Sequence, residues 1–204
     1  MAMILFVRHG STEWNAARRI QGREQVPLSR EGRLQIEALI TPIQAWGPEA
    51  IYTSPLSRSL ESAYIIAGAL GLTPIPVSEL TELDVGQWAG KTVEEISTEH
   101  SWITYQNSPS LATPPLGEPI LNFSDRIIKG LEVVLDEGFS RTVIVTHGDV
   151  IRAAVCHYIG LPLDRLHYVK VGLGSVTILC GLRGAPRLLT LNHTSSWEEV
   201  DGAL

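Results

Sequence analysis

The sequence predicts an α/β fold: a three-layer αβα arrangement around a mostly parallel central sheet. Short apolar stretches that fit buried strands alternate along the 204-residue chain with longer stretches of helical periodicity. The composition is 44% hydrophobic and 19% charged, which provides for a sizeable core and excludes a disordered protein. This length is typical of one domain, so we expect a single domain over residues 1–204.

Two strand–helix units are predicted in the first part of the chain. Residues 3–7 are apolar throughout, as in a buried parallel strand. Ser29 can cap a helix that ends at Gly47, and residues 50–53 form the next strand. A second amphipathic helix is expected over residues 56–70. The apolar residues of the first helix recur at helical spacing: Ile36, Leu39, Ile40 and Ile43.

A third and a fourth helix are predicted in the middle of the chain. Thr92 and Glu95 have the spacing of a capping box, so a helix should begin there. Apolar residues step by four across residues 123–135, which indicates another helix. The segment 107–119 between them is rich in Pro and Ser and is predicted to be an ordered loop.

The C-terminal part is predicted to hold a strand, a helix and a hairpin. Residues 142–146 are strongly β-forming, and residues 150–159 form an apolar helix. Residues 176–180 and 187–191 flank a turn rich in Gly, Pro and Arg, so they are expected to pair as a hairpin. This hairpin could present an edge strand, which leaves room for a homodimer.

Charge and composition exclude several classes of protein. The net charge of −6 disfavours nucleic-acid binding, so any anion must be held by a local group of cations. No apolar stretch reaches the roughly 18 residues of a membrane span, and no basic leader precedes the first strand. Cys156 and Cys180 form neither a disulfide framework nor a zinc site. We therefore expect a soluble cytoplasmic protein.

Polar residues follow three of the predicted strands where each strand ends. Arg8 and His9 follow the first strand, Arg58 lies shortly after the second, and His147 follows the third. Because ligands bind beyond the carboxyl ends of the strands in open parallel sheets, these side chains should converge at one crevice. Two arginines, two histidines and nearby helix N-termini predict a phosphate-binding pocket.

Other potential ligands are assigned no such role. No set of His, Asp and Cys has metal-ligand spacing, so we expect no metal. The histidines outside the predicted pocket are expected to be structural: His100, His157, His167 and His193.

Four motifs in order carry a resemblance to a known family. They are Arg8-His9-Gly10 with Asn15 and Gln21-Gly22, Ser54-Pro55-Leu56-Ser57-Arg58-Ser59, the segment from Glu82 to Gly90, and Thr146-His147-Gly148. Together they resemble the histidine phosphatase superfamily, which contains cofactor-dependent phosphoglycerate mutases, alpha-ribazole phosphatase and broad-specificity phosphatases. The match extends from Met3 to about Asn192. It implies a small lid insertion at about residues 80–124.

The resemblance also implies roles for the motif residues. His9 would attack phosphorus and become phosphohistidine, while Glu82 would protonate the leaving oxygen and then help to activate water. Both roles fit the chemistry, because a neutral imidazole is a good nucleophile and an alkoxide is a poor leaving group. The rate should then fall in acid as His9 protonates and in alkali as Glu82 ionises. The other motif residues would bind the phosphate group, the arginines and His147 also acting in catalysis: Arg8, Asn15, Gln21, Gly22, Arg58, His147 and Gly148.

The composition of the lid favours a phosphatase over a mutase. Between Glu79 and Ser124 the only Lys or Arg is Lys91, against seven acidic residues. Mutases of the family carry basic residues there that bind a second anionic group, which an acidic lid would hold poorly. We therefore expect a metal-independent phosphomonoesterase that needs no cofactor and acts on a small, largely uncharged or hydroxyl-rich phosphate ester. The alternatives are a phosphoglycerate mutase primed by 2,3-bisphosphoglycerate and, in another class, an inactive phospholigand-binding module.

Three groups of residues keep two interpretations each. The aromatic residues of the lid could contact the substrate or form the core of the lid: Trp88, Trp102 and Tyr105. The arginines after the first motif could supply charge to the pocket or be solvated: Arg18, Arg19 and Arg23. The Gly-Gly-Glu-Ser turn of the family is Leu116-Gly117-Glu118-Pro119 here, which leaves the role of Glu118 open.

Overall fold

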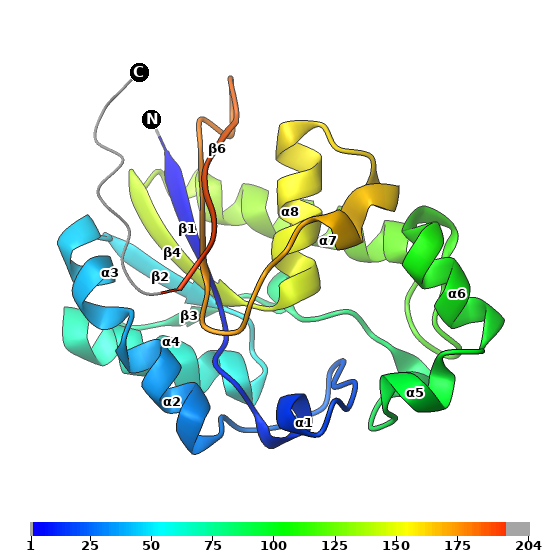
Figure 1. The fold of residues 1–204 in the computed structure, drawn as a ribbon. Helices are drawn as coiled ribbons and strands as arrows, with labels where there is room; N and C mark the ends of the chain where they lie inside the picture. The colour runs from blue at the N-terminus through cyan, green and yellow to red at the C-terminus, as the bar shows by residue number, and fades with distance from the viewer. Residues whose placement is uncertain (1, 195–204) are drawn as a thin grey trace.

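The computed structural model describes residues 2–194, in which a six-stranded sheet lies between two layers of helices (Figure 1). The strand order is β3-β2-β4-β1-β5-β6. The pairs β3-β2, β2-β4 and β4-β1 are parallel, and the pairs β1-β5 and β5-β6 are antiparallel. The predicted αβα fold with a mostly parallel sheet is therefore confirmed. The strands are β1 Met3–Arg8, β2 Ala50–Thr53, β3 Ile75–Pro76, β4 Arg141–Thr146, β5 Val176–Cys180 and β6 Arg187–His193.

Side chains alternate across the sheet and divide the core into two halves. Ile4 and Phe6 of β1 pack with one cluster of buried residues, while Leu5 and Val7 pack with another. The first cluster includes α7 (Ile120–Asp136) and α8 (Gly148–Ile159). The second includes the helices on the opposite face, which are α2 (Arg30–Glu37), α3 (Ile40–Trp46) and α4 (Ser57–Leu70).

The expected continuous helix from Ser29 to Gly47 is wrong, because two helices, α2 and α3, occupy this stretch. Ser29 caps the first as predicted, accepting a hydrogen bond from the Gly32 N–H at 3.1 Å. Pro42 explains the break, since it has no N–H for the carbonyl of Ala38 and its ring clashes with that carbonyl. The two-residue β3 was also not predicted; it is exposed at the sheet edge, where Pro76 costs no ladder hydrogen bond.

The segment predicted to be a lid, called the lid below, lies between β3 and α7 and consists of short helices. They are η1 Ser78–Leu80, η2 Gly86–Trp88, α5 Val93–Ile96, α6 His100–Asn107 and η3 Pro109–Leu111. The capping box predicted at Thr92 is present at the start of α5, and the predicted loop 107–119 contains η3. In Figure 1, α5 lies across from α1 (Glu13–Ala16), near the end of the sheet where β1 and β4 finish, and α6 lies next to α5. Backbone hydrogen bonds join Ile20 to Gly90 and Lys91 of the lid.

The remaining helix, η4 (Leu163–Tyr168), links α8 to the predicted hairpin, which is present as β5 and β6. Between residues 2 and 194 no helix combines the length and the apolar character that crossing a membrane requires.

Candidate active site

The sheet brings three chain segments together at one edge. Because β2, β4 and β1 are adjacent, their carboxyl ends align, and the N–H groups of His9 and Ser54 both donate to carbonyls of β4, at 2.9 and 3.0 Å. A cavity of about 310 Å³ opens beside them. Seven of the predicted site residues line it: Arg8, His9, Asn15, Gln21, Gly22, Arg58 and Glu82. His147 is fully buried next to them, its ring centroid 5.3 Å from that of His9.

His9 is held in the form that a nucleophile requires. Its Nδ1 lies 2.7 Å from the carbonyl oxygen of Gly10. A carbonyl can only accept, so Nδ1 carries the proton and the lone pair is on Nε2. Burial, with the positive charges of Arg58 and Arg8, lowers the pKa of His9 well below its ordinary value of 6.5. The imidazole is therefore neutral, with an unprotonated Nε2, at neutral pH.

Arg8 and Arg58 are fixed by backbone carbonyls. Arg58 lies in the first turn of α4, is 1% exposed, and donates to Gly22 at 2.6 Å and Glu24 at 2.8 Å. Arg8 donates to the carbonyl of Val171 at 2.7 Å. The Nε atoms of both guanidinium groups are buried and have no hydrogen-bond partner among residues 2–194. Since buried donors are normally paired, each arginine keeps a donor suited to an anion.

His147 is oriented by two serines from the second motif. Its Nε2 lies 2.7 Å from the Oγ of Ser54 and 3.4 Å from the Oγ of Ser59. Ser54 Oγ already accepts from the N–H of Leu56 at 3.3 Å, so its own hydrogen is free to bond to Nε2. With the Ser54 hydroxyl as the donor, the ring proton is on Nδ1, a buried atom for which the described structure shows no partner. Burial and the nearby Arg58 lower the pKa of His147 well below 6.5, so the ring is neutral at neutral pH.

Glu82 has the environment of a general acid. One of its oxygens accepts from the N–H of Leu83 at 2.9 Å. Burial, with the negative charge of Asp149, raises the pKa of Glu82 to about 7, against the lowering effects of the Leu83 N–H, Arg58 and Arg8. A substantial fraction of this carboxyl is therefore protonated at neutral pH, next to the nucleophile and the arginines.

The smaller motif residues have different surroundings. Asn15 closes a capping box, its Oδ1 accepting from the N–H of Thr12 at 3.1 Å, so its amide nitrogen is the end that is free to donate. Gly22 has a φ of +50°, which favours glycine, and lines the cavity. Gly148 does not line the cavity; a Cβ there would lie 3.3 Å from the Arg8 guanidinium, so this glycine makes room for Arg8.

Sequence reasoning missed a second charged group in the cavity. Arg152 lines it and donates to Asp149 at 2.7 Å, and the Tyr105 hydroxyl donates to the other oxygen of Asp149 at 2.6 Å. Burial alone would raise the pKa of Asp149, but Arg152 and Tyr105 hold it below its ordinary value, so Asp149 is ionised. The i,i+3 spacing of Asp149 and Arg152 in the first turn after the second histidine was a signal that could have identified them.

The aromatic residues of the lid are shown to form its core and also to line the cavity. Ring centroids in the trio are 5.3 to 5.8 Å apart, and Trp88 is fully buried. Tyr105 also contacts His167, whose ring packs edge-on against the Tyr105 ring with centroids 4.5 Å apart. The same side of the lid therefore provides both a packed interior and a wall of the cavity.

The three arginines after the first motif have three separate environments. Arg18 pairs with Glu94 on the surface, 3.6 Å apart and both largely exposed. Arg19 lines the cavity and donates to the carbonyl of Gly90 at 2.6 Å. Arg23 binds Glu118 at 3.0 Å. Besides Arg8 and Arg58, two arginines from outside the lid, Arg19 and Arg152, thus line the cavity. Of the two interpretations left open for the arginines after the first motif, Arg19 fits the supply of charge to the pocket, and Arg18 fits solvation.

Potential metal ligands and thiols complete the inventory of the described residues. Within residues 2–194, no three or more His, Cys, Asp or Glu side chains are grouped so that they could hold a metal ion. Cys156 and Cys180 are buried free thiols.

Comparisons with known proteins agree with this geometry. A family model described as histidine phosphatase superfamily (branch 1) matches residues 4–194. A protein named probable phosphoglycerate mutase GpmB, from Serratia proteamaculans (strain 568), is 34% identical over 166 residues, which is 79% of this chain and 77% of that protein. Bacillus stearothermophilus YhfR has a TM-score of 0.89 at 30% identity, covering 96% of this chain and 98% of its own. A mycobacterial glucosyl-3-phosphoglycerate phosphatase solved with VO3 has a TM-score of 0.87 at 26% identity, covering 95% and 100%.

Proposed function

Because the chain belongs to the histidine phosphatase superfamily, we propose that it is a phosphomonoesterase that hydrolyses a small organic phosphate through a phosphohistidine on His9. One observation carries the proposal: a neutral, tautomerically fixed His9 lines the same small cavity as Arg8, Arg58 and a proton-bearing Glu82. Charge compensation, a nucleophile and an acid are the three components that cleavage of a phosphate ester requires.

The first half of the reaction transfers the phosphoryl group to the enzyme. His9 Nε2 attacks phosphorus while the bond from phosphorus to the ester oxygen breaks. Glu82 gives its proton to that oxygen, so the leaving group departs as an alcohol and Glu82 becomes a carboxylate. Arg8, Arg58 and the Nδ1–H of His147 hold the three non-bridging oxygens, with help from Asn15.

The second half returns the enzyme to its starting state. The Glu82 carboxylate takes a proton from water as that water attacks the phosphorus of phosphohistidine. The bond from phosphorus to Nε2 breaks, inorganic phosphate leaves, and His9 is again neutral. No step requires a metal ion, because the two arginines compensate the charge and His147 donates a hydrogen bond; EDTA should leave the rate unchanged.

The dependence of kcat/KM on pH is expected to have an alkaline limb near pH 7. Glu82 must carry its proton to act as an acid, and its raised pKa of about 7 means that this proton is lost as the pH rises through 7. The acid limb from His9 should lie well below pH 6.5, since its pKa is lowered. In Glu82→Gln the alkaline limb should disappear. A wild-type kcat/KM that stays constant from pH 6 to 9 would contradict the role of Glu82.

A phosphoglycerate mutase is the second candidate, favoured by the named GpmB relatives and by Arg19 and Arg152 in the cavity. Glycerol 3-phosphate and 3-phosphoglycerate are a matched pair of substrates, because they differ in a hydroxymethyl group against a carboxylate. We expect release of inorganic phosphate from at least one of the pair, with or without 2,3-bisphosphoglycerate. Isomerisation of 3-phosphoglycerate that depends on this primer and outpaces phosphate release would instead establish the mutase.

The same pair measures what the extra arginines do. Wild type could have a higher kcat/KM for 3-phosphoglycerate than for glycerol 3-phosphate. If Arg19→Ala removes this difference, Arg19 binds the carboxylate of the leaving group. Equal values for both substrates would favour the hydroxyl-rich, uncharged leaving group that the composition of the lid predicts.

A further inference from the structure

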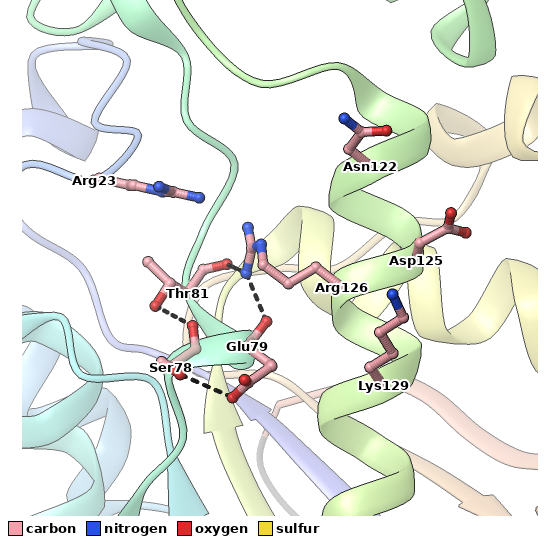
Figure 2. Close-up of a pocket in the computed structure, with 8 residues that line it drawn as sticks. All are labelled: Arg23, Ser78, Glu79, Thr81, Asn122, Asp125, Arg126 and Lys129. Carbon is pink, nitrogen blue, oxygen red and sulfur yellow. Dashed lines mark hydrogen bonds between the residues drawn. The ribbon is translucent and has the colours of Figure 1, made fainter.

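The backbone segment that contains Glu82 is hydrogen-bonded to Arg126, an arginine that does not line the catalytic cavity. Figure 2 shows Arg126 extending from α7 toward the segment 78–81, at a groove of about 590 Å³ that also contains Arg23 and Lys129. Arg126 is missing from the residues that line the catalytic cavity. It was not singled out by any motif, and it bonds both to backbone carbonyls and to the Glu118 side chain.

Arg126 bonds to three carbonyls around the general acid. Its guanidinium donates to the carbonyls of Glu79 at 2.6 Å, Thr81 at 2.8 Å and Glu82 itself at 3.4 Å. Arg23 approaches from the other side of the segment (Figure 2) and donates to the carbonyl of Glu82 at 3.3 Å. Hydrogen bonds with a charged donor are roughly twice as strong as neutral ones, so the backbone leading to Glu82 is held firmly.

Glu118 bonds to both arginines and to the backbone that follows Glu82. It accepts from Arg126 at 2.7 Å and from Arg23 at 3.0 Å, and the same oxygen accepts from the N–H of Asp84 at 2.9 Å. The backbone is therefore fixed both before Glu82, at Thr81, and after it, at Asp84. This arrangement gives Glu118 the structural role that the altered turn in the sequence left open.

The position of Arg126 is itself determined by α7. Its guanidinium lies 5.2 Å from the ring centroid of buried Phe123, one turn earlier on the same helix. One turn later, Gly130 lets the helix approach the segment closely, since a Cβ there would lie 2.5 Å from the Cβ of Glu79. Any larger residue at 130 must push residue 79 away and disturb the contacts of Arg126.

We propose that Arg126, held by Glu118, is a positioning residue that fixes the backbone of residues 79–84 so that the Glu82 carboxyl is aligned with the leaving-group oxygen. The proposal rests on the proposed phosphatase function and adds to it a residue outside the catalytic cavity. An arginine suits this task because its planar fork bonds to several acceptors at once, which the single ammonium of a lysine cannot do. Misplacing a catalytic group by about 1 Å can cost on the order of 100-fold in rate.

The test compares two substrates that differ in how much their leaving group depends on protonation by Glu82. An alkyl phosphate leaves as a poor alkoxide and needs the Glu82 proton, whereas 2,4-dinitrophenyl phosphate leaves as a stable phenolate and does not. The alkyl phosphate that wild type hydrolyses fastest serves as the first substrate. For Glu82→Gln, the benchmark, kcat/KM for the alkyl phosphate should fall about 100-fold or more and that for the dinitrophenyl ester should change little.

Arg126→Gln should reproduce the pattern of the benchmark, with a loss of about 10- to 100-fold for the alkyl phosphate and at most about threefold for the dinitrophenyl ester. Arg126→Lys should lose less than Arg126→Gln. Gly130→Ala, which displaces residue 79 without touching the arginine, should show the same selective loss. The control is Lys129→Gln, which removes a charge from the same groove but no bond to the segment, and both substrates should be unaffected.

The outcomes separate the two proposals. Equal losses on both substrates in Arg126→Gln, Arg126→Lys and Gly130→Ala would overturn the positioning role, because a smaller folded fraction lowers both rates alike. If Arg126→Gln does not fold, as judged by circular dichroism, the other two variants carry the test. A wild-type protein that hydrolyses the dinitrophenyl ester and no alkyl phosphate, or neither, would overturn the proposed function itself.

Discussion

Replacing His9 with alanine is expected to lower kcat/KM for p-nitrophenyl phosphate by at least about 10⁴-fold, because the reaction loses its nucleophile. The fold should survive the change. The His9 side chain makes one hydrogen bond within residues 2–194, to the Gly10 carbonyl, and its ring packs against that of His147 at the cavity, so the apolar core is left intact by its removal. Steady-state hydrolysis and thermal unfolding of the same preparation would check both expectations.

His157→Ala is the matched control for this variant. His157 lies on the exposed side of α8, where its ring contacts Tyr158 and not the cavity. Its replacement should leave the rate within about twofold of wild type. Wild-type turnover in His9→Ala would remove the mechanism, since no other residue in the cavity is presented as an unprotonated imidazole with a free Nε2.

The second large effect is expected at Arg58. Arg58→Ala should lower kcat/KM about 1,000-fold, because one of the two guanidinium groups that stabilise the transferred phosphoryl group is lost. Inhibition by inorganic phosphate should weaken in parallel. Arg58→Lys should keep part of the activity, since a lysine preserves the charge but not the fork that also binds the carbonyls of Gly22 and Glu24.

Arg33 provides the control for Arg58. Arg33 lies in α2 and forms an exposed ion pair, away from the cavity, with Glu61 of α4, the helix that carries Arg58. Arg33→Ala should have wild-type kinetics, because exposed ion pairs contribute little. An Arg58→Ala protein that is folded, that keeps its activity within fivefold and that is inhibited by phosphate as strongly as wild type would contradict a role for Arg58 in holding phosphate.

The residues at the ends of the strands could be predicted from sequence for a general reason. His9, Arg58 and His147 each follow a recognisable strand, and parallel strands bring their carboxyl ends to the same edge of a sheet. The partners that tune these residues could not be predicted in the same way. The Ser54 hydroxyl on His147 and the Gly10 carbonyl on His9 depend on side-chain rotamers that only the packed structure fixes.

The charge of the cavity could not be predicted from the sequence of the lid. Its lack of basic residues was read correctly, but the charge of the cavity depends on neighbours that come from elsewhere, namely Arg19 and Arg152. Composition of a segment cannot report what another segment places beside it. Arg126 is a similar case, since its effect on Glu82 depends on the close approach of α7 at Gly130. Pro42, by contrast, was a visible helix breaker whose signal was outweighed by the apolar periodicity around it.

The central claim is that His9 forms a covalent bond to phosphorus, and trapping that bond tests it most directly. In Glu82→Gln, 2,4-dinitrophenyl phosphate should still phosphorylate the enzyme, while hydrolysis of the intermediate is slowed because the base is missing. We predict a rapid burst of one dinitrophenolate per enzyme, with the phosphoryl group located by mass spectrometry on His9 and absent in His9→Ala. Turnover without a burst, or a phosphoryl group on any other residue, would contradict the account.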